Sequence, residues 1–562
     1  MTPWIQAYDP LASPWLSTAA AALPIVILLV ALGVLEWRAH IAALTGLLAA
    51  LGVATLVFGM PVTAAAATAV YGAAYGFLPI GWIVLNAVFL YELTVATGQF
   101  QVLRVSVGQL SRDRRVQALL VAFSFGAFIE GACGFGAPIA ICSALLIGLG
   151  FTPLYAAGLS LIANTAPVAF GSIGIPILTL ASVTDMPART LGMMAGRQLP
   201  FVSLIIPIWL VAAMSGRRGL RGVWPAVLVC GGTFAIVQFL WSNFVGVELV
   251  DIAGGVSSIG ALALLCRFWQ PREIWTFAED RLGNGPVATA TPVADGRAVR
   301  RAWMPWLFLS IAVIVWGMTP VKAALNASPI LAPRFSVPSL HRLVFRDYPV
   351  VPQRIDPARI GDPAYRAAHA EAAVYTFNWV SATGTGVLLA TLATALYFRV
   401  RAAQLRAVAR ATFGRMRVPL ATIMLMLSLG FVTRYGGTDA TLGLAFTRTG
   451  ALYPFFATFL GWLGVALTGS DTSSNVLFGS LQKITAQQLG FNPVLIVTAN
   501  STGGVMGKMI DAQSIVVSTA STGQSGQEGR ILRFVFWHSV ALATIMGIIV
   551  MLQAYVFPWM IP

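Results

Sequence analysis

The feature that most constrains this chain is an apolar stretch interrupted by glycines and one carboxylate, residues 128–138. It reads FIEGACGFGAP and belongs to a run that is long and apolar enough to cross a membrane. Closely spaced glycines break a helix, and a carboxylate in hydrocarbon is costly enough to imply a function. Non-helical backbone is tolerated at membrane depth only where protein buries it or where it lines a wet cavity. We therefore expect this stretch to form the tip of a re-entrant hairpin that faces a substrate chamber.

Apolar sequence dominates the rest of the chain as well. Of its 562 residues, 57% are hydrophobic and only 10% are charged, whereas soluble domains carry roughly 25% charged residues. The chain is therefore predicted to be an all-α polytopic membrane protein embedded in a lipid bilayer. Its first apolar run, residues 19–35, lacks a positive n-region and a clear cleavage site, so we interpret it as a retained first span.

The formal net charge of +15 does not indicate a nucleic-acid partner. The arginines lie in short loops between apolar runs, which is the distribution of positive charge found in cytoplasmic loops. The four cysteines and four histidines show no metal-ligand spacing. The expected partners are thus the bilayer and a small molecule, with no cofactor, and no signal in the sequence fixes an oligomeric state.

A second broken stretch, residues 467–475, resembles the first. It reads LTGSDTSSN and again places a carboxylate and small residues between apolar arms. Each stretch is followed by Leu-Gly-Phe-x-Pro and then by Ala-Asn, and the two copies are 336 to 340 residues apart. Two broken segments at matching places in two halves indicate a transporter's binding site. The alternative is that glycine and serine only let helices pack closely, which does not account for the two carboxylates.

The apolar runs predict about twelve transmembrane helices and two re-entrant hairpins, arranged as an inverted repeat. The predicted segments are a first half, 1–269, with a hairpin at 117–150 and a broken helix at 153–183; a cytoplasmic loop at 270–303; and a second half, 304–562, with an extracytoplasmic loop at 323–372, a hairpin at 449–489 and a broken helix at 493–519. If each hairpin enters and leaves by one face, the basic loops 99–116, 215–222, 270–303 and 399–417 share one side, the cytoplasm.

A broken helix exposes backbone donors and a dipole end that favour an anion. Short polar side chains and glycines near the breaks add donors and let a ligand approach the backbone. The predicted substrate-binding residues are Gly131, Gly134, Asn164, Thr165, Arg197, Ser474, Asn475, Asn500, Ser501 and Lys508. Such a site suits a small carboxylate with a hydroxyl group. Proton coupling needs a group that gains and loses charge, and Glu130 and Asp471 are the candidates.

Other charged residues leave two interpretations open. Lys508 and Asp511, spaced i and i+3, form either a satisfied ion pair or a group in which Lys508 attracts the substrate carboxylate. Arg197 allows the same two interpretations. The second break is expected just ahead of Lys508. Glu248 and Asp251 lie at an outer loop, where a solvated turn is the preferred interpretation.

These motifs resemble the L-lactate permease family over nearly the whole chain. The matching strings lie at residues 130–138, 162–171, 196–200, 469–475 and 507–510. The resemblance implies uptake of lactate, and often glycolate, with protons across a bacterial inner membrane. It also implies an elevator-type ion-transporter architecture. Arg434 departs from the pattern, because a small polar residue is expected at that position, and the loop 323–372 is longer than expected.

Two transport hypotheses and two other classes follow. The first is proton symport of L-lactate and related 2-hydroxy monocarboxylates, D-lactate and glycolate among them. The second is sodium-coupled transport of a (di)carboxylate, because the Ser-, Thr- and Asn-rich breaks also suit a sodium site. An enzyme would need a nucleophile with its base or a set of metal ligands, and neither pattern occurs in the sequence. Two occluding hairpins argue against a channel.

Overall fold

The computed structural model describes residues 3–33, 35, 37–108, 110–132, 134, 136–277, 295–351, 353–524 and 527–562, and most of them are helical. The helices of the first half are α1 Pro14–Gly33, α2 Ala39–Gly52, α3 Val62–Tyr75, α4 Trp82–Ala96, α5 Gln99–Gly108, α6 Arg114–Ala118, α7 Gly126–Ala132, α8 Ala137–Gly148, α9 Pro153–Ala163, α10 Gly171–Thr184, α11 Ala188–Ala195, α12 Leu199–Leu240 and α13 Val250–Phe268. Those of the second half are α15 Gly296–Gly317, α16 Thr319–Ala327, α17 Pro363–His369, α18 Thr383–Tyr397, α19 Ala402–Gly436, α20 Thr438–Phe446, α21 Tyr453–Thr468, α22 Asp471–Leu489, α23 Pro493–Gly507, α24 Ala512–Ser521 and α25 Glu528–Tyr555.

Nine helical segments of the described residues are long and apolar enough to cross a membrane, or ten if one bent pair counts as a span. The sequence predicts about twelve. One of the nine, Ala188–Val245, has 58 residues, and a straight helix of that length would measure roughly 87 Å against a hydrocarbon core of about 30 Å. The backbone leaves helical geometry within it at Gly216 (φ 65°, ψ −171°), so this segment supplies two crossings. Helices α8 and α18, with 12 and 15 residues, are apolar but shorter. The chain is a multi-pass membrane protein.

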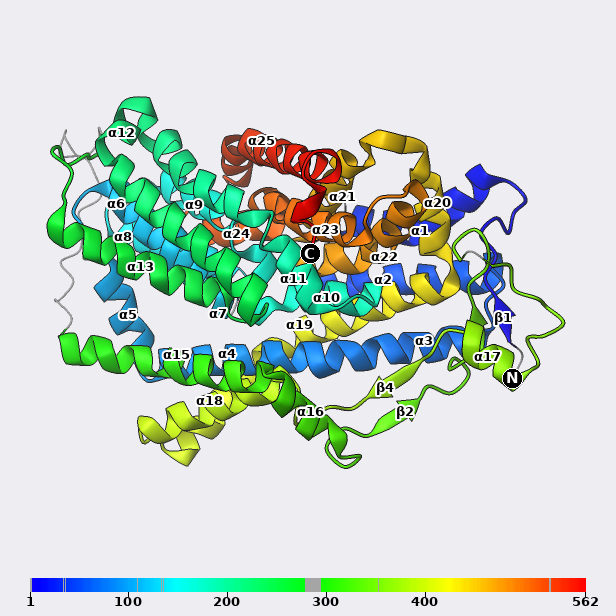
Figure 1. The fold of residues 1–562 in the computed structure, drawn as a ribbon. Coiled ribbons are helices and arrows are strands. Elements are labelled where there is room, and N and C mark those ends of the chain that lie inside the picture. Colours follow the sequence, from blue (N-terminus) through cyan, green and yellow to red (C-terminus); the bar gives the residue numbers. More distant parts are fainter. Residues whose placement is uncertain are drawn as a thin grey trace.

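Three of the arginine-rich loops meet at one end of the molecule. Arg115 is buried and donates hydrogen bonds to the carbonyl oxygens of Gly219 (2.9 Å) and Glu273 (2.9 Å). The amide of Trp275 donates to Asp113 Oδ2 at 3.0 Å. In Figure 1 this end, with α5 and α6, lies on the left. The contacts place residues 110–116, 215–222 and 270–277 on the same face.

The N-terminus and the long polar loop meet at the opposite end. Strand β1, Trp4–Ile5, pairs in parallel with β3, Val344–Phe345, and β2, Arg334–Ser336, pairs antiparallel with β4, Val374–Thr376. Figure 1 shows β1 and α17 together on the right. The side chain of Gln6 ties this cap to the end of α19 by donating to the carbonyl oxygens of Arg434 (3.0 Å) and Tyr435 (2.9 Å).

Between these ends, the helices form two packed groups. Helices α2, α3 and α4 pack on α19, α4 also packs on α18, and α18 packs on α15. In Figure 1, α15, α4 and α3 follow one line across the lower part of the view, with α18 and α16 below it. In the second group, α12 packs on α13, and α21, α22, α23 and α25 pack on one another. Contacts also cross between the halves of the chain, because α8 packs on α24 and α10 packs on α22. The interrupted helices lie at these crossings.

Candidate functional site

The first helix break follows Ala163. Residues 164–167 form turns, a short 3-10 segment covers Val168–Phe170, and the axes of the two helical pieces differ by 63°. Pro167 contributes, because proline lacks an amide donor and disfavours helix at the residue before it. Helix α10 then begins with left-handed backbone at Ser172 (φ 47°) and Ile173 (φ 61°). A β-branched residue in this region is a strained feature of the kind that clusters at functional sites.

The second break lies later than the sequence predicts. Helix α23 continues through Asn500 and Ser501 to Gly507, and the interruption covers Lys508 to Asp511. Of the glycines ahead of it, Gly503 and Gly507 allow close helix packing instead. A Cβ on Gly503 would collide with Thr458, so α21 and α23 approach closely because this residue has no side chain.

The tip of the first stretch lies between α7 and α8 and has left-handed backbone at Gly134 (φ 56°) and Gly136 (φ 78°). Glu130 is buried near the end of α7, only 5% exposed. Its Oε1 atom occupies space that glycines leave open: a Cβ on Gly171 would lie 2.6 Å from it, and a Cβ on Gly134 would lie 3.3 Å from it. The Glu130 carboxyl group therefore occupies the space left by the missing side chains of Gly134 and Gly171.

The second carboxylate, Asp471, lies in the first turn of α22. Gly469 ends α21 in the left-handed conformation, and Ser470 caps α22 by accepting a hydrogen bond from the amide of Ser473 at 3.2 Å. An acidic residue in the first turn is stabilised by the helix dipole. Ser501 of α23 donates to Asp471 Oδ2 at 2.5 Å, so the second tip is attached to the side of α23.

Lys508 connects the second break to the turn between α21 and α22. Its Nζ donates to the carbonyl oxygen of Gly469 at 2.7 Å and lies 3.4 Å from Asp511 Oδ2. Asp511 in turn caps α24 by accepting from the amide of Ser514 at 2.7 Å. The ion-pair interpretation is thus correct. Lys508 also interacts electrostatically with Glu130 and Asp471, the two predicted proton-binding carboxylates. We refer to Lys508, Glu130 and Asp471 as the central cluster.

Several buried polar atoms around this cluster have no hydrogen-bond partner among the described residues. They are Glu130 Oε2, both amide atoms of Asn164, Thr165 Oγ1 and Asp471 Oδ1. Asn164 lies near Glu130 and interacts with its carboxyl group. Neither of the Asn164 amide atoms, however, meets hydrogen-bond geometry with a described residue. Buried polar atoms are nearly always paired, so this set of donors and acceptors is suited to a ligand.

Asp251 joins the cluster, and the expectation of a solvated turn there is wrong. It is 1% exposed in the first turn of α13, neither of its carboxylate oxygens has a hydrogen-bond partner among the described residues, and it interacts with Glu130. Helix α13 comes this close to α7 because of glycines. A Cβ on Gly131 would lie 2.8 Å from Asp251 Cβ, and one on Gly255 would lie 2.7 Å from the amide of Phe128. Its apolar neighbours in sequence, Val250-Asp251-Ile252, were the available signal.

The predicted site residues Asn475 and Asn500 form a continuous chain of hydrogen bonds with Gln482. Asn500 donates to Asn475 Oδ1 at 3.0 Å and accepts from Gln482 Nε2 at 3.2 Å, while Asn475 donates to the carbonyl oxygen of Pro176 at 3.1 Å. Ser474 donates to the carbonyl oxygen of Gly461 at 3.1 Å. These side chains are satisfied by protein groups and hold α22, α23 and α10 together.

Arg197 lies apart from the cluster. Its guanidinium donates to Asn243 Oδ1 at 2.9 Å and to the carbonyl oxygen of Met560 at 2.8 Å. These bonds tie the start of α12 to the segment before α13 and to the C-terminus. The structure therefore favours the satisfied interpretation of Arg197 over a role in binding substrate.

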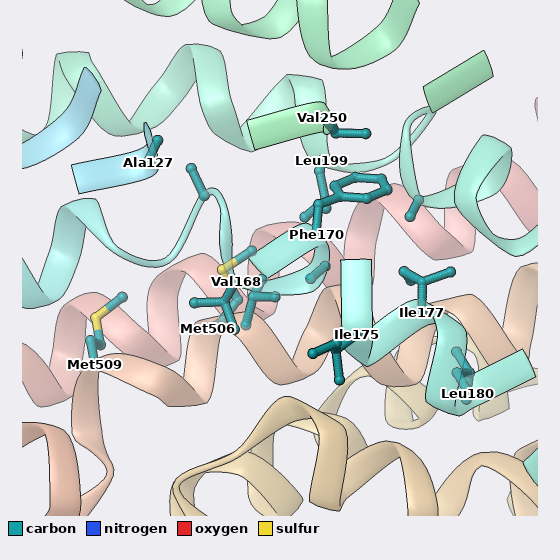
Figure 2. Close-up of a cluster of buried hydrophobic side chains, with 14 of the residues drawn as sticks. Ala127, Val168, Phe170, Ile175, Ile177, Leu180, Leu199, Val250, Met506 and Met509 are labelled. Atoms are coloured by element: carbon teal, nitrogen blue, oxygen red, sulfur yellow. The ribbon is translucent and has the colours of Figure 1, made fainter. Parts of the chain in front are cut away.

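Apolar side chains surround the breaks on several sides. Figure 2 shows Val168 and Phe170 from the first break with Met506 and Met509 from the second, together with Leu199 and Val250. All of them are less than 5% exposed. Water is excluded from such surroundings, so charges and hydrogen bonds there are stronger than at a surface.

The sequence comparisons identify one family over nearly the whole chain. The L-lactate permease family model matches residues 17–557. An L-lactate permease of Salmonella typhi is 46% identical over the full length of both chains, and the glycolate permease GlcA of Escherichia coli K12 is 45% identical, again over both full lengths. Among solved structures, the YdaH transporter of Alcanivorax borkumensis matches with a TM-score of 0.44 at 15% identity and 88% coverage of each chain.

Proposed function

Because the chain belongs to the L-lactate permease family, we propose that it imports L-lactate and related short 2-hydroxy monocarboxylates, D-lactate and glycolate among them, by proton symport across a bacterial inner membrane. Its relatives include proteins named for lactate and for glycolate. A pocket for both substrates needs groups that recognise the shared carboxylate and 2-hydroxyl rather than the methyl group.

The observation that carries this proposal is the set of unpartnered polar atoms at the crossing of the two breaks. Asn164 offers an amide donor and an acceptor, and Thr165 offers a hydroxyl, all buried and without a partner among the described residues. A 2-hydroxy acid presents a carboxylate that accepts hydrogen bonds and a hydroxyl that both donates and accepts. Binding such a ligand satisfies these atoms, whereas leaving them unpaired costs about 1–3 kcal/mol each.

The charges around the proposed substrate site support proton coupling. Lys508 is already paired with Asp511, which leaves Glu130, Asp251 and Asp471 without a second cation within the described part of the site. Unpaired charges are expensive at membrane depth. Neighbouring carboxyl groups under these conditions share protons. Adding an anionic substrate increases the negative charge, so the substrate binds together with a proton on Glu130 or its neighbours.

An inverted repeat with re-entrant tips is the architecture that we infer for this mechanism. It is supported by the reciprocal packing of the halves, in which α8 of the first tip contacts α24 after the second break, and α22 of the second tip contacts α10 after the first break. The second group of helices, which carries both tips, would move against the group formed by α2, α3, α4, α15, α18 and α19, as in an elevator-type transporter.

Uptake of radiolabelled L-lactate into proteoliposomes under imposed gradients tests the proposal. An inward proton gradient without sodium should drive accumulation, and a protonophore should abolish it. Glycolate and D-lactate should compete, and succinate should not. Accumulation that follows a sodium gradient and persists with the protonophore would refute proton coupling in favour of a sodium-coupled (di)carboxylate transporter. Absence of lactate uptake under every gradient would refute the substrate assignment.

A further inference from the structure

A second polar site lies at the end of the molecule that carries the N-terminus. There the long loop, α10, α19 and α22 enclose a cavity of about 90 Å³. Three cations, Arg346, Arg434 and Lys483, and two carboxylates, Asp185 and Glu371, line it. The cavity is distinct from the cluster around Lys508, although α10 and α22 contribute to both.

One carboxylate, Glu371, pairs with both arginines and balances one of their two positive charges. Arg346 Nε lies 2.8 Å from Glu371 Oε1, and Arg434 Nη2 lies 3.2 Å from Glu371 Oε2. Burial raises the pKa of Glu371, but the two guanidinium groups outweigh burial and leave its pKa below the ordinary value. Glu371 therefore remains an anion and holds both arginines at the cavity wall.

The other cationic donors are not fully used. Arg434 lies 3.6 Å from Asp185 Oδ2, but the Asp185 side chain is 80% exposed, and exposed pairs of this kind contribute at most about 1 kcal/mol. Arg434 Nε has no hydrogen-bond partner among the described residues. Lys483 Nζ donates to the carbonyl oxygen of Thr184 at 2.7 Å, which occupies only one of its three protons.

A third acid lies behind the cavity wall. Asp439 interacts with Arg346 and Arg434, but it accepts hydrogen bonds from Ser480 and from its neighbouring amide in α20 and does not line the cavity. In the described residues, Lys483 has no carboxylate within ion-pair distance. The side of the cavity nearest Lys483 therefore carries the excess positive charge.

We propose that this cavity is an outer anion site, which binds the carboxylate group of a small organic acid between Arg434 and Lys483. The bound carboxylate replaces the exposed Asp185 as the second ionic partner of Arg434, beside Glu371, and uses the free protons of Lys483. That the anion is the transported 2-hydroxy acid rests on the function proposed above. The site then collects substrate before it reaches the helix breaks.

The shared helices connect the two sites. Lys483 lies twelve residues after Asp471 on α22, and Thr184 lies thirteen residues after Gly171 on α10. Helix α22 is regular between Asp471 and Lys483, so at 1.5 Å per residue it spans roughly 18 Å between the outer site and the central cluster. A positively charged cavity at this distance raises the local concentration of anions and increases their rate of association.

Kinetics of L-lactate uptake in proteoliposomes test the outer site with Lys483→Gln. We expect KM to rise roughly tenfold while kcat stays within twofold, and we expect KM to become less sensitive to ionic strength, because the removed charge acts by screened attraction. Lys483→Arg should restore the wild-type KM. Lys322 is the control, since it pairs with Glu248 at 3.7 Å and does not line the cavity, and Lys322→Gln should leave KM unchanged.

A binding measurement separates the outer site from the proposed transport. Acetate at constant ionic strength should raise the Tm of the purified full-length protein relative to chloride, and Lys483→Gln should remove that difference while Asn164→Ala retains it. This result supports the outer site even if lactate proves not to be transported. An unchanged KM in Lys483→Gln, or an acetate effect that survives the substitution, overturns the outer site, whatever substrate the protein carries.

Discussion

Two buried asparagines offer a test that separates binding from stability. Asn164 and Asn500 are both at most 2% exposed and both lie near the cluster. Both amide atoms of Asn164 are unpartnered within the described residues, whereas Asn500 is hydrogen-bonded at both ends to α22. The substitutions Asn164→Ala and Asn500→Ala should therefore have opposite consequences.

For Asn500→Ala the loss is structural. Hydrogen bonds between membrane helices contribute on average about 0.6 and at most about 1.7 kcal/mol each. Two are lost, so the free energy of unfolding should fall by about 1–3 kcal/mol, and Asn475 Oδ1 is left without its donor. Gln482 keeps its bond to the carbonyl oxygen of Ala457 at 2.8 Å. The affinity for lactate should change little in the protein that remains folded.

For Asn164→Ala the loss is in binding. Removing an unpaired buried amide relieves its desolvation, so stability should stay within about 1 kcal/mol of wild type or increase. A hydrogen bond to a charged carboxylate contributes about 1.5–3 kcal/mol, which corresponds to roughly a 10- to 150-fold weaker affinity for lactate.

Thermal unfolding and equilibrium binding of radiolabelled lactate to purified protein measure both quantities. If Asn164→Ala binds lactate like wild type, or loses stability as Asn500→Ala does, then the unpartnered amide is not a ligand group. The reasoning from unsatisfied atoms would be refuted with it.

Three further substitutions and one control probe the carboxylates and the glycine packed against Asp471. Glu130→Gln should abolish proton-driven accumulation of lactate but retain exchange of internal for external lactate, because exchange needs no proton release; accumulation equal to wild type would exclude this residue from coupling. Asp251→Asn should be produced at normal abundance and should make uptake less dependent on external pH. An unaltered pH profile would show that Asp251 has no part in proton binding. Gly504→Ala should abolish uptake because its Cβ would collide with the Asp471 carboxylate. Gly232→Ala, also inside a helix but with open space around it, should stabilise the protein by about 1 kcal/mol and transport normally; similar behaviour of the two variants would show that the collision is relieved without cost.

The sequence predicted the parts of the site that have a local signature. Glu130 and Asp471 stand out because a carboxylate within an apolar run has few structural explanations, and Pro167 marks the first break because proline acts on its own backbone. The position of the second break was missed because α23 is continued by contacts with α21, which is distant in sequence. Glycines that break a helix and glycines that pack against one look identical in a single sequence.

Asp251 and Arg197 are two residues whose surroundings the local sequence did not reveal. The first was expected to be solvated and is buried, and the second was a candidate ligand and is already hydrogen-bonded. Asp251 follows a loop at the end of a span, where a solvated turn has the same composition, and only the approach of α13 to α7 buries it. Arg197 has the charge to attract a carboxylate, and only the fold reveals that Asn243 and the C-terminus already occupy it. Whether a polar group is satisfied depends on residues tens to hundreds of positions away, so this property cannot be read from local sequence.

The position of Lys508 gives a physical reason to expect the proposed proton coupling rather than facilitated diffusion. This amine holds the second tip through Gly469 and interacts with Glu130 from the first tip. An anion that arrives alone adds negative charge next to Glu130, Asp251 and Asp471, whereas an anion that arrives with one proton leaves the net charge of the cluster unchanged. With two protons the moving group carries one positive charge, and the membrane potential then contributes about 2.3 kcal/mol per 100 mV. Lactate uptake at zero pH gradient, measured with and without an imposed potential, decides between one and two protons. A potential that drives uptake requires more than one proton per lactate, and a potential without effect requires one.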